Sequence, residues 1–246
     1  MDIKNSGRTL DVFEAFAQET RALRLTELAA SLAAPVSSCY QLIGTLQRRG
    51  YLYAMNGKSY YPTKRMLHNV QAIAAADPVA NILGNMLEAL RDVTGESVIL
   101  AQRALDQAMI IDVIESRHSI RYSAQPGELR PLHSSAIGKA LLAQMTREER
   151  DRVLPQDPFP QTTSNTLVTR ADLEADLKRS KTQGWYKAMG ESVAELEAVA
   201  APLHFAGNDF AIAIAGPVNR FAPRHKDIAR ALMDAIKNFE TKLEKP

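Results

Sequence analysis

The sequence has 246 residues but only one cysteine, Cys39. A single thiol forms no intrachain disulfide and cannot build a multi-cysteine zinc cage. No apolar run approaches the roughly 20 residues that a helix needs to cross a bilayer. The opening residues, MDIKNSGRTL, contain neither the apolar core nor the cleavage site of a secretory signal. These absences favour a cytoplasmic protein that has no membrane partner.

Charge is distributed unevenly along the chain. The net charge is +2, but residues 1–65 hold nine Lys and Arg against five Asp and Glu, and the remainder is slightly acidic. Hydrophobic residues make up 46% of the sequence and charged residues 24%, as in an ordinary globular protein. The length favours two domains, and the basic first quarter indicates a polyanion as partner.

The first fifty residues predict three short helices. Apolar residues recur with helical spacing over about residues 8–18. Thr26 can cap a second helix over 27–33. Pro35 suits the first position of the third helix, because the N–H that proline lacks would be unpaired there. Gly50 ends this helix.

A hairpin follows. The segment YLYAMNGKSYYP, residues 51–62, alternates around Asn56 and Gly57, a pair typical of tight turns. Lys58 lies at the predicted tip. Three short helices and a hairpin form the winged helix-turn-helix plan, in which the third helix enters the major groove of DNA and the hairpin touches the backbone beside it.

The third helix has a polar outer face. Its inward stripe is predicted to be Cys39, Leu42, Ile43 and Leu46. The outward hydroxyl and amide groups can bond base edges or phosphates, whereas a glutamate there would be repelled by phosphates. The candidate DNA contacts are Thr26, Ser37, Ser38, Tyr40, Gln41, Thr45, Arg48 and Lys58. Winged helices also bind proteins, so a protein-contact role is the alternative.

The rest of the chain mixes helices and strands. Residues 64–77 predict a connecting helix, and Pro78 opens a longer one whose inner side is predicted to be Ile82, Met86, Leu87 and Leu90. Strands are predicted over 96–104, 107–116, 119–124, 185–189, 196–206 and 208–218. Helices are predicted over 134–145, 146–154 with Thr146 as cap, 171–184 with Thr169 as cap, and from Pro223 to about Leu243. This order indicates an α+β domain with a sheet covered by helices.

The segment PLHSSAIG, residues 131–138, places hydroxyls at a predicted helix start. A ligand carboxylate could lie against Ser134, Ser135 and Ala136, because unpaired N–H groups and the helix dipole favour an anion there. The other interpretation is that one serine simply caps the helix.

Catalysis is the less favoured interpretation of this segment. His133 beside two serines suggests a nucleophile and a base, but adjacent residues rarely reach the geometry that this pair needs. The G-x-S-x-G elbow is missing, and the scattered histidines lack metal-binding spacing. The sequence therefore predicts no cofactor and no metal. An enzyme on the C-terminal domain remains an alternative.

Three strings, found in this order, resemble the IclR family of bacterial transcriptional regulators. LTELAASLAAPVSSCYQLIGTLQRRGYL (25–52) looks like the DNA-binding helices of that family, and GELRPLHSSAIGKALLA (127–143) resembles its signature region. GWYKAMGESVAELEAVAAPLHFAGNDFAIAIAGP (184–217) resembles its second block, with an AAP strand and a final Gly-Pro. The resemblance runs nearly from end to end.

The resemblance implies three parts: a winged helix-turn-helix domain over 1–63, a linker helix over 64–77, and an effector-binding domain over 78–246 that is similar to GAF and PAS folds. Family members are homodimers or homotetramers that bind operator DNA and a small metabolite, often an organic or aromatic acid. The effector-binding candidates are then Leu132, Ser134, Ser135, Ala136, Met189, Glu191, Ala198, Ala213 and Ala215.

The chain departs from the family pattern at several positions. Gln41 stands where arginine is frequent, and Glu195 where glycine is usual. Ala213 and Ala215 stand where serines are frequent, and alternation along a strand puts them on one face. An apolar wall there favours a hydrophobic or aromatic acid over a small hydroxy acid, unless the alanines merely pack under a helix. We therefore expect a ligand-responsive transcriptional regulator that binds DNA as a dimer or tetramer.

Overall fold

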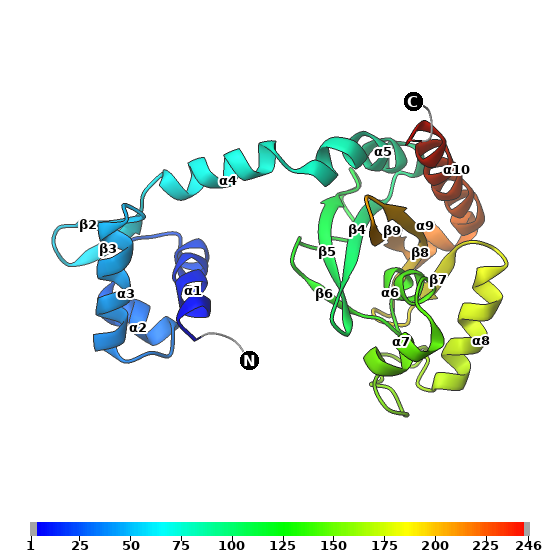
Figure 1. Cartoon of the computed structure of the whole chain (residues 1–246), viewed down its shortest axis with the longest axis horizontal. Coiled ribbons are helices and arrows are strands. Elements are labelled where there is room, and N and C mark those ends of the chain that lie inside the picture. The colour runs from blue at the N-terminus through cyan, green and yellow to red at the C-terminus, as the bar shows by residue number, and fades with distance from the viewer. Residues whose placement is uncertain (1–3, 244–246) are drawn as a thin grey trace. The chain divides into compact units, whose positions relative to one another are not determined.

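The computed structural model describes residues 4–243. Contacts between residues divide the chain into two units, one ending at Pro78 and the other beginning at Val79 (Figure 1). The structure has the expected fold class, a winged helix-turn-helix domain followed by a C-terminal α+β domain. None of the helices in the described part of the chain combines the length and the apolar character needed to span a membrane.

The N-terminal unit contains four helices and a small antiparallel sheet with the strand order β1-β3-β2. Its elements are α1 (Lys4–Glu19), β1 (Leu23–Arg24), α2 (Leu25–Ser31), α3 (Val36–Arg48), β2 (Leu52–Met55), β3 (Ser59–Pro62) and α4 (Arg65–Ala75). Three helices precede the β2–β3 hairpin, so this unit has the winged helix-turn-helix plan that the sequence predicts.

Two helix starts differ from the sequence prediction. Thr26 lies inside α2 and does not cap it. The helix begins directly after β1, and the Glu27 carboxylate accepts a hydrogen bond of 2.7 Å from the backbone N–H of Arg24. Pro35 flanks α3 with extended backbone dihedrals, and Val36 is the first helical residue.

The apolar faces of the three helices meet in one core. On α3, Cys39, Ile43 and Leu46 are buried, and Leu42 is partly buried, as the predicted stripe requires. Tyr61 of the hairpin joins this core through an edge contact with Phe16, with ring centroids 5.9 Å apart. The core therefore fixes α3 and the hairpin on one body.

The start of α4 is fastened to the hairpin through Tyr51. The amide of Asn69 donates a hydrogen bond of 3.1 Å to the Tyr51 hydroxyl. The guanidinium of Arg65 lies 5.2 Å from the centroid of the same ring, within the range of a cation–π contact. The Thr63 hydroxyl also donates to the Gly50 carbonyl at 2.6 Å. The first two turns of α4 thus belong to the N-terminal unit.

The C-terminal unit is built on an antiparallel sheet with the strand order β6-β5-β4-β9-β8-β7. Its strands are β4 (Ser97–Ala104), β5 (Gln107–Ile114), β6 (Leu129–Pro131), β7 (Tyr186–Met189), β8 (Leu196–Phe205) and β9 (Asn208–Pro217). Its helices are α5 (Pro78–Thr94), α6 (Ala136–Leu142), α7 (Arg147–Val153), α8 (Arg170–Lys181), α9 (Val218–Phe221), the short 3-10 turn η1 (Ala222–Arg224) and α10 (His225–Leu243).

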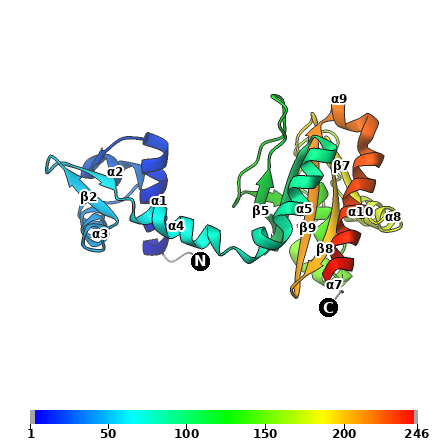
Figure 2. The same ribbon diagram turned by 90° about the horizontal axis from the view of Figure 1, so that it is seen from above.

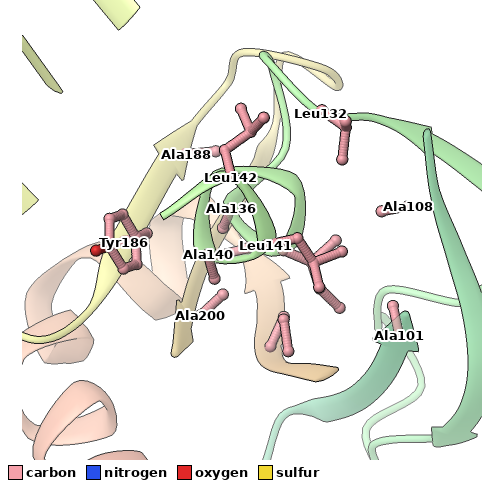
Figure 3. Close-up of a cluster of buried hydrophobic side chains, with 14 of the residues drawn as sticks. Ala101, Ala108, Leu132, Ala136, Ala140, Leu141, Leu142, Tyr186, Ala188 and Ala200 are labelled. Carbon is pink, nitrogen blue, oxygen red and sulfur yellow. The ribbon is translucent and has the colours of Figure 1, made fainter. Parts of the chain in front are cut away.

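Helices cover both faces of this sheet. Helices α5 and α10 contribute to one apolar cluster with alternate residues of the central strands (Figure 2). Helices α6 and α8 contribute to the cluster on the other face. Figure 3 shows Ala136, Ala140 and Leu141 of α6 among side chains of the sheet such as Ala200. The second cluster contains many alanines, so its side chains are short where α6 meets the strands.

Several predicted elements of this unit need correction. Residues 119–124 form no strand. They lie in a loop held by side chains, in which the Ser97 hydroxyl donates to the Tyr122 carbonyl at 2.6 Å and Arg121 pairs with Glu115 at 2.8 Å. On α5 the buried apolar residues are Leu83, Leu87 and Leu90, whereas Ile82 is 46% exposed. The last helix begins at His225, because Pro223 belongs to the preceding 3-10 turn.

Gly138 allows α6 to pack directly on the chain that precedes it. A Cβ atom at this position would lie 2.6 Å from the Leu132 carbonyl oxygen and 2.7 Å from that of Pro131. We expect Gly138→Ala to lower the free energy of unfolding by about 3 kcal/mol, because backbone atoms cannot yield as side chains do. Urea denaturation measures this change.

Gly84 provides the matched control. It lies inside α5, and apart from its chain neighbours and the adjacent helix backbone no atom lies within 4 Å of the position that a Cβ would take. Gly84→Ala should raise the free energy of unfolding by about 0.5–1 kcal/mol, because alanine is the better helix former. Equal effects of the two substitutions would contradict the packing argument.

Candidate functional site

The eight residues predicted to contact DNA are all exposed on the N-terminal unit. Six of them lie on α3, Thr26 lies in the first turn of α2, and Lys58 lies at the tip of the hairpin. Tyr40 is 64% exposed, a large fraction for an aromatic residue in a helix. The polar face of α3 is therefore open to solvent along its length.

Thr45 organises the middle of this face. Its hydroxyl donates to the Gln41 carbonyl at 2.9 Å and accepts a hydrogen bond of 3.1 Å from the Arg48 guanidinium. These bonds hold Arg48 along the helix surface. The Thr45 hydroxyl therefore positions a cation, in addition to any contact of its own.

Hollows lie along α3 on the hairpin side and on the α1 side. The hollow on the hairpin side is lined in part by Gln47, Arg48 and Tyr60, and the hollow on the α1 side in part by Arg8 and Ser38. Gln41 and Thr45 line both. Sequence reasoning missed Arg8 and Tyr60, because α1 and β3 meet α3 only through tertiary packing.

The hairpin tip has the backbone that its sequence predicts. Asn56 and Gly57 have φ values of 51° and 65°, in the left-handed region that these residues tolerate best. The N–H of Lys58 donates to the Met55 carbonyl at 3.2 Å and closes the turn. The Lys58 ammonium is thereby carried at the end of the wing.

The C-terminal unit contains a cavity of about 40 Å³ between α6 and the sheet. Most of its lining is apolar and comes from Ile99, Ile110, Ala136, Ile137, Ala188, Leu196, Ala198, Ala213 and Ala215. Its polar lining consists of Tyr122, Arg130, Ser135, Glu191 and Ser192. A few polar groups on an apolar wall are typical of a site for a small organic molecule.

The structure brings together six of the nine predicted effector-binding residues. Ser135, Ala136, Glu191, Ala198, Ala213 and Ala215 all line the cavity. The other three do not line it. Leu132 and Ser134 are buried elsewhere, and Met189 is 44% exposed because alternation along β7 turns Ala188 toward the cavity instead.

Ser135 caps α6. Its hydroxyl accepts a hydrogen bond of 3.1 Å from the Gly138 N–H and donates one of 2.7 Å to the Pro131 carbonyl. Both functions of the hydroxyl are used within the protein. The plainer interpretation of this serine therefore holds, and its hydroxyl is a poor anchor for a ligand carboxylate.

His133 has a structural environment. It is buried, its Nε2 lies 3.0 Å from the Pro160 carbonyl, and its ring centroid is 5.2 Å from that of Phe159. Burial lowers the pKa of His133 below its ordinary value. The His133 imidazole is thus hydrogen-bonded to the Pro160 carbonyl, and the Ser135 hydroxyl is hydrogen-bonded to the Pro131 carbonyl.

Arg130 brings a cation to the cavity. Its Nε donates a hydrogen bond of 3.1 Å to the Tyr122 hydroxyl, and its Nη2 pairs with the Glu128 carboxylate. Sequence reasoning missed both Arg130 and Tyr122. Arg130 stands in the quoted signature string, but only the pairing of β6 with β5 shows which face it takes.

Lys139 of α6 is the centre of a buried charge cluster. Its side chain is 1% exposed, and its ammonium lies 2.9 Å from the Asp176 carboxylate and 2.7 Å from that of Glu191. It also donates to the Lys187 carbonyl at 3.1 Å. The ammonium thus has two hydrogen-bond acceptors and a second carboxylate in ion-pair contact, which compensates for the loss of water.

The two carboxylates of this cluster titrate differently. Burial raises the pKa of Glu191 above its ordinary value, and the nearby Asp176 carboxylate adds to this, although the Lys139 ammonium favours the charged form. Burial acts in the same direction on Asp176, but Lys139 and Arg179 together hold the pKa of Asp176 below its ordinary value. Asp176 is therefore the more strongly ionised of the two.

The two units together define a class of protein. A winged helix-turn-helix with an open polar face is a DNA-binding unit. A second unit with a site that carries a cation and an apolar wall has the character of a small-molecule receptor. This combination defines a DNA-binding regulator that responds to a ligand.

The chain belongs to the IclR family of bacterial transcriptional regulators. The IclR helix-turn-helix domain matches residues 7–54, and the C-terminal domain of the bacterial transcriptional regulator IclR matches residues 71–240. The protein is thus a transcriptional regulator with a DNA-binding N-terminal domain and a C-terminal effector domain.

Individual relatives agree with this assignment. The transcriptional repressor IclR of Escherichia coli K12 is 29% identical over 232 residues, which cover 89% of this chain and 81% of that protein. The crystal structure of Thermotoga maritima IclR has the same fold, with a TM-score of 0.79, 19% identity, and coverage of 98% and 99% of the two chains. An IclR homologue from Microbacterium hydrocarbonoxydans, complexed with 4-hydroxybenzoate, matches with a TM-score of 0.78, 19% identity, and coverage of 98% and 100%.

The charge cluster leads to a stability prediction. Lys139→Met keeps much of the side-chain volume but leaves Asp176 and Glu191 without their shared cation. We expect the free energy of unfolding to fall by about 3–5 kcal/mol at neutral pH, because two partly buried carboxylates then lose their shared counter-ion and repel each other. Urea denaturation of the variant and the wild type measures the loss.

The loss should shrink in acid, since protonation removes the repulsion. In the wild type itself, the raised pKa of Glu191 also favours the folded state at low pH. Its contribution to stability is full below its unfolded pKa and is lost as the pH rises through the folded pKa. Lys178→Met, exposed on α8, is the control and should change stability by less than about 0.5 kcal/mol. A pH-independent loss at Lys139 would contradict the electrostatic explanation.

Proposed function

We propose that this regulator acts in the cytoplasm, binds operator DNA as a dimer or tetramer, and senses a small organic acid with a hydrophobic or aromatic body. The effector occupies the cavity between α6 and the sheet. The observation that carries the ligand assignment is a guanidinium, Arg130, on a cavity wall that is otherwise mostly apolar.

The DNA-binding role of individual residues rests on exposure and chemistry. Ser37, Ser38 and Gln41 offer hydrogen-bonding groups on the first turns of α3, which face the base edges in this motif. Arg48 and Lys58 attract phosphates. The alternative use of the winged helix for protein contacts is opposed by the absence of acidic residues from α3.

The Arg130 cation favours a ligand that carries an acid group. The small apolar residues of the cavity wall favour a ligand with a hydrophobic body. Ala213 and Ala215 leave room on β9 without offering a hydrogen bond. The 4-hydroxybenzoate of the Microbacterium homologue is a ligand of that protein. Its combination of a carboxylate and an aromatic ring agrees with the polar and apolar lining of the cavity in this chain, and it supports an acid of the same general class.

Self-association is supported by an apolar stripe on α4. Leu67, Val70 and Ile73 recur with helical spacing, and Ile73 is 72% exposed. An exposed stripe of this kind on a helix is typical of a surface that pairs with another helix. A dimer would also present two reading helices to a two-fold symmetric operator.

We also propose that the protein is not an enzyme. The Ser135 hydroxyl donates to the Pro131 carbonyl, and His133 is bonded to Pro160. A serine nucleophile needs its base within hydrogen-bonding reach, and these two side chains have other partners. Turnover that is lost on Ser135→Ala would overturn this view.

Two substitutions separate base reading from phosphate contact. Gln41→Ala should cost about 1–3 kcal/mol of discrimination between operator and unrelated DNA. Lys58→Ala should weaken binding to both DNAs alike and reduce the salt dependence by about one phosphate contact. Gel shifts at several salt concentrations, with DNA flanking the gene itself, measure both effects.

Gln18→Ala, on the exposed side of α1, is the matched control and should bind like the wild type. If Gln41→Ala keeps the affinity and the footprint of the wild type, Gln41 does not read bases. If the wild type binds none of the flanking fragments even at low salt, the winged helix has another partner.

A thermal-shift screen tests the effector. Benzoate-type and phenylacetate-type acids should raise the melting temperature by a few degrees at saturating concentration, because binding to the native state stabilises it by mass action. Arg130→Gln should abolish the shift, and Arg224→Gln, an exposed arginine of the same unit, should preserve it. A stronger response to glyoxylate or pyruvate would contradict the proposed ligand class.

A further inference from the structure

The polar groups of the effector cavity come from opposite edges of the sheet. Arg130 belongs to β6, which is one edge strand, and Glu191 follows β7, which is the other. Between these edges the cavity is lined by one or two apolar residues from each intervening strand: Ile110, Ile99, Ala213, Ala215 and Ala198. The site therefore has a cation toward one edge, a carboxyl toward the other, and an apolar floor between them.

Arg130 has donors left for a ligand. A guanidinium carries five N–H groups. Three of its hydrogen bonds are with the Tyr122 hydroxyl, the Leu129 carbonyl and the Glu128 carboxylate. Because the Tyr122 hydroxyl accepts from Arg130, its own proton can point to a third group. A ligand carboxylate can thus receive bonds from both residues.

Glu191 has an acceptor left for a ligand. Its Oε1 is bonded to Lys139 at 2.7 Å. Its Oε2 is buried and has no hydrogen-bond partner within the described residues. A buried carboxylate oxygen without a donor is costly, and native structures leave few of them. The backbone carbonyl of Glu191 accepts from the hydroxyls of Thr163 and Thr166, and the bond from Lys139 to Oε1 restrains the carboxylate itself.

We propose that the effector is bipolar: a carboxylate that binds Arg130 and Tyr122, an apolar middle, and a remote hydroxyl or amino group that donates a hydrogen bond to Glu191 Oε2. This inference rests on the proposed effector site and specifies its ligand further. A plain hydrocarbon tail would leave Oε2 without a donor, whereas a remote donor supplies the missing bond.

Charged and titratable groups around Glu191 set its protonation. Lys139 contacts it from α6, and Asp176 faces the same ammonium from α8 with Arg179 behind it. His133, on the segment before α6, is influenced by the same ammonium. Burial raises the pKa of Glu191, so its carboxyl changes charge closer to neutrality than an exposed glutamate does. The ionised form is the stronger acceptor for a ligand donor.

Matched ligand pairs test this inference by calorimetry on the full chain. The probes are benzoate with 4-aminobenzoate, phenylacetate with 4-hydroxyphenylacetate, and 3-phenylpropionate with its 4-hydroxy analogue, which place the donor at increasing distance from the acid. In at least one pair the donor-bearing acid should bind about tenfold more tightly or better, as expected for a hydrogen bond to a charged group.

Glu191→Gln should remove this preference. Lys139 will hold the amide oxygen, which places the NH₂ group where Oε2 was and leaves no acceptor there. The affinity ratio within the responsive pair should fall to about one. Glu88→Gln, exposed on α5, is the matched control and should keep the wild-type ratio. Arg130→Gln should weaken both members of a pair and leave their ratio unchanged, because the two ends bind separately.

A second measurement needs no variant and covers the case in which Glu191→Gln fails to fold. In the wild type, the preference for the donor-bearing acid should grow as the pH is raised from acid to neutral, because burial raises the pKa of Glu191 and its carboxyl ionises over that change. Titration of His133 affects both members of a pair alike and cancels in the ratio.

The outcomes are distinct. If the acids bind but no donor improves affinity in any pair, or if the preference survives both Glu191→Gln and the change of pH, the bipolar ligand is overturned and the proposed acid sensor stands. If no acid of any pair binds, the proposed effector class and this inference both fail.

Discussion

The C-terminal unit depends on the burial of one ammonium group. Lys139 is almost fully enclosed, and its ammonium is held from three parts of the chain: by an ion pair with Asp176 of α8 and by hydrogen bonds to the backbone of β7 and to Glu191 in the loop after β7. An unpaired ammonium at this depth would cost several kcal/mol. Helix α6 can therefore occupy its place only while Asp176 and Glu191 keep theirs, so the wall of the cavity and the charge cluster form one arrangement.

The cavity itself follows from short side chains. Four alanines, from β7, β8 and β9, face α6 where larger residues would fill the space, and Gly138 allows the helix to lie against the preceding backbone. A ligand that enters this space touches Glu191 and so reaches the Lys139 cluster directly. Such a ligand biases the protein only if one arrangement of the cluster binds it better than another. Glu191 gives that difference a physical basis, because a new hydrogen bond to its carboxylate changes the electrostatic environment of the Lys139 ammonium.

The sequence predicts the elements with local signals well and the site only in part. The hairpin turn at Asn56 and Gly57 and the cap of α7 at Thr146 depend on neighbouring residues, and both have the expected form. The segment 119–124 has the alternation of a strand, but bonds to Ser97 and Glu115 hold it as a loop. Arg130 and Lys139 were visible in the signature string. Their roles depend on strand pairing and on partners more than 30 residues away, which no local pattern reports.

The N-terminal unit adds a constraint on how a signal can reach DNA. Tyr51, at the base of the hairpin, holds the first two turns of α4 through Arg65 and Asn69, and the hairpin shares its core with α3. A change in the direction of α4 must therefore carry the wing and the reading helix with it as one body. In the dimer proposed above, the spacing between the two reading helices, and not their internal structure, is then the quantity that an effector has to alter.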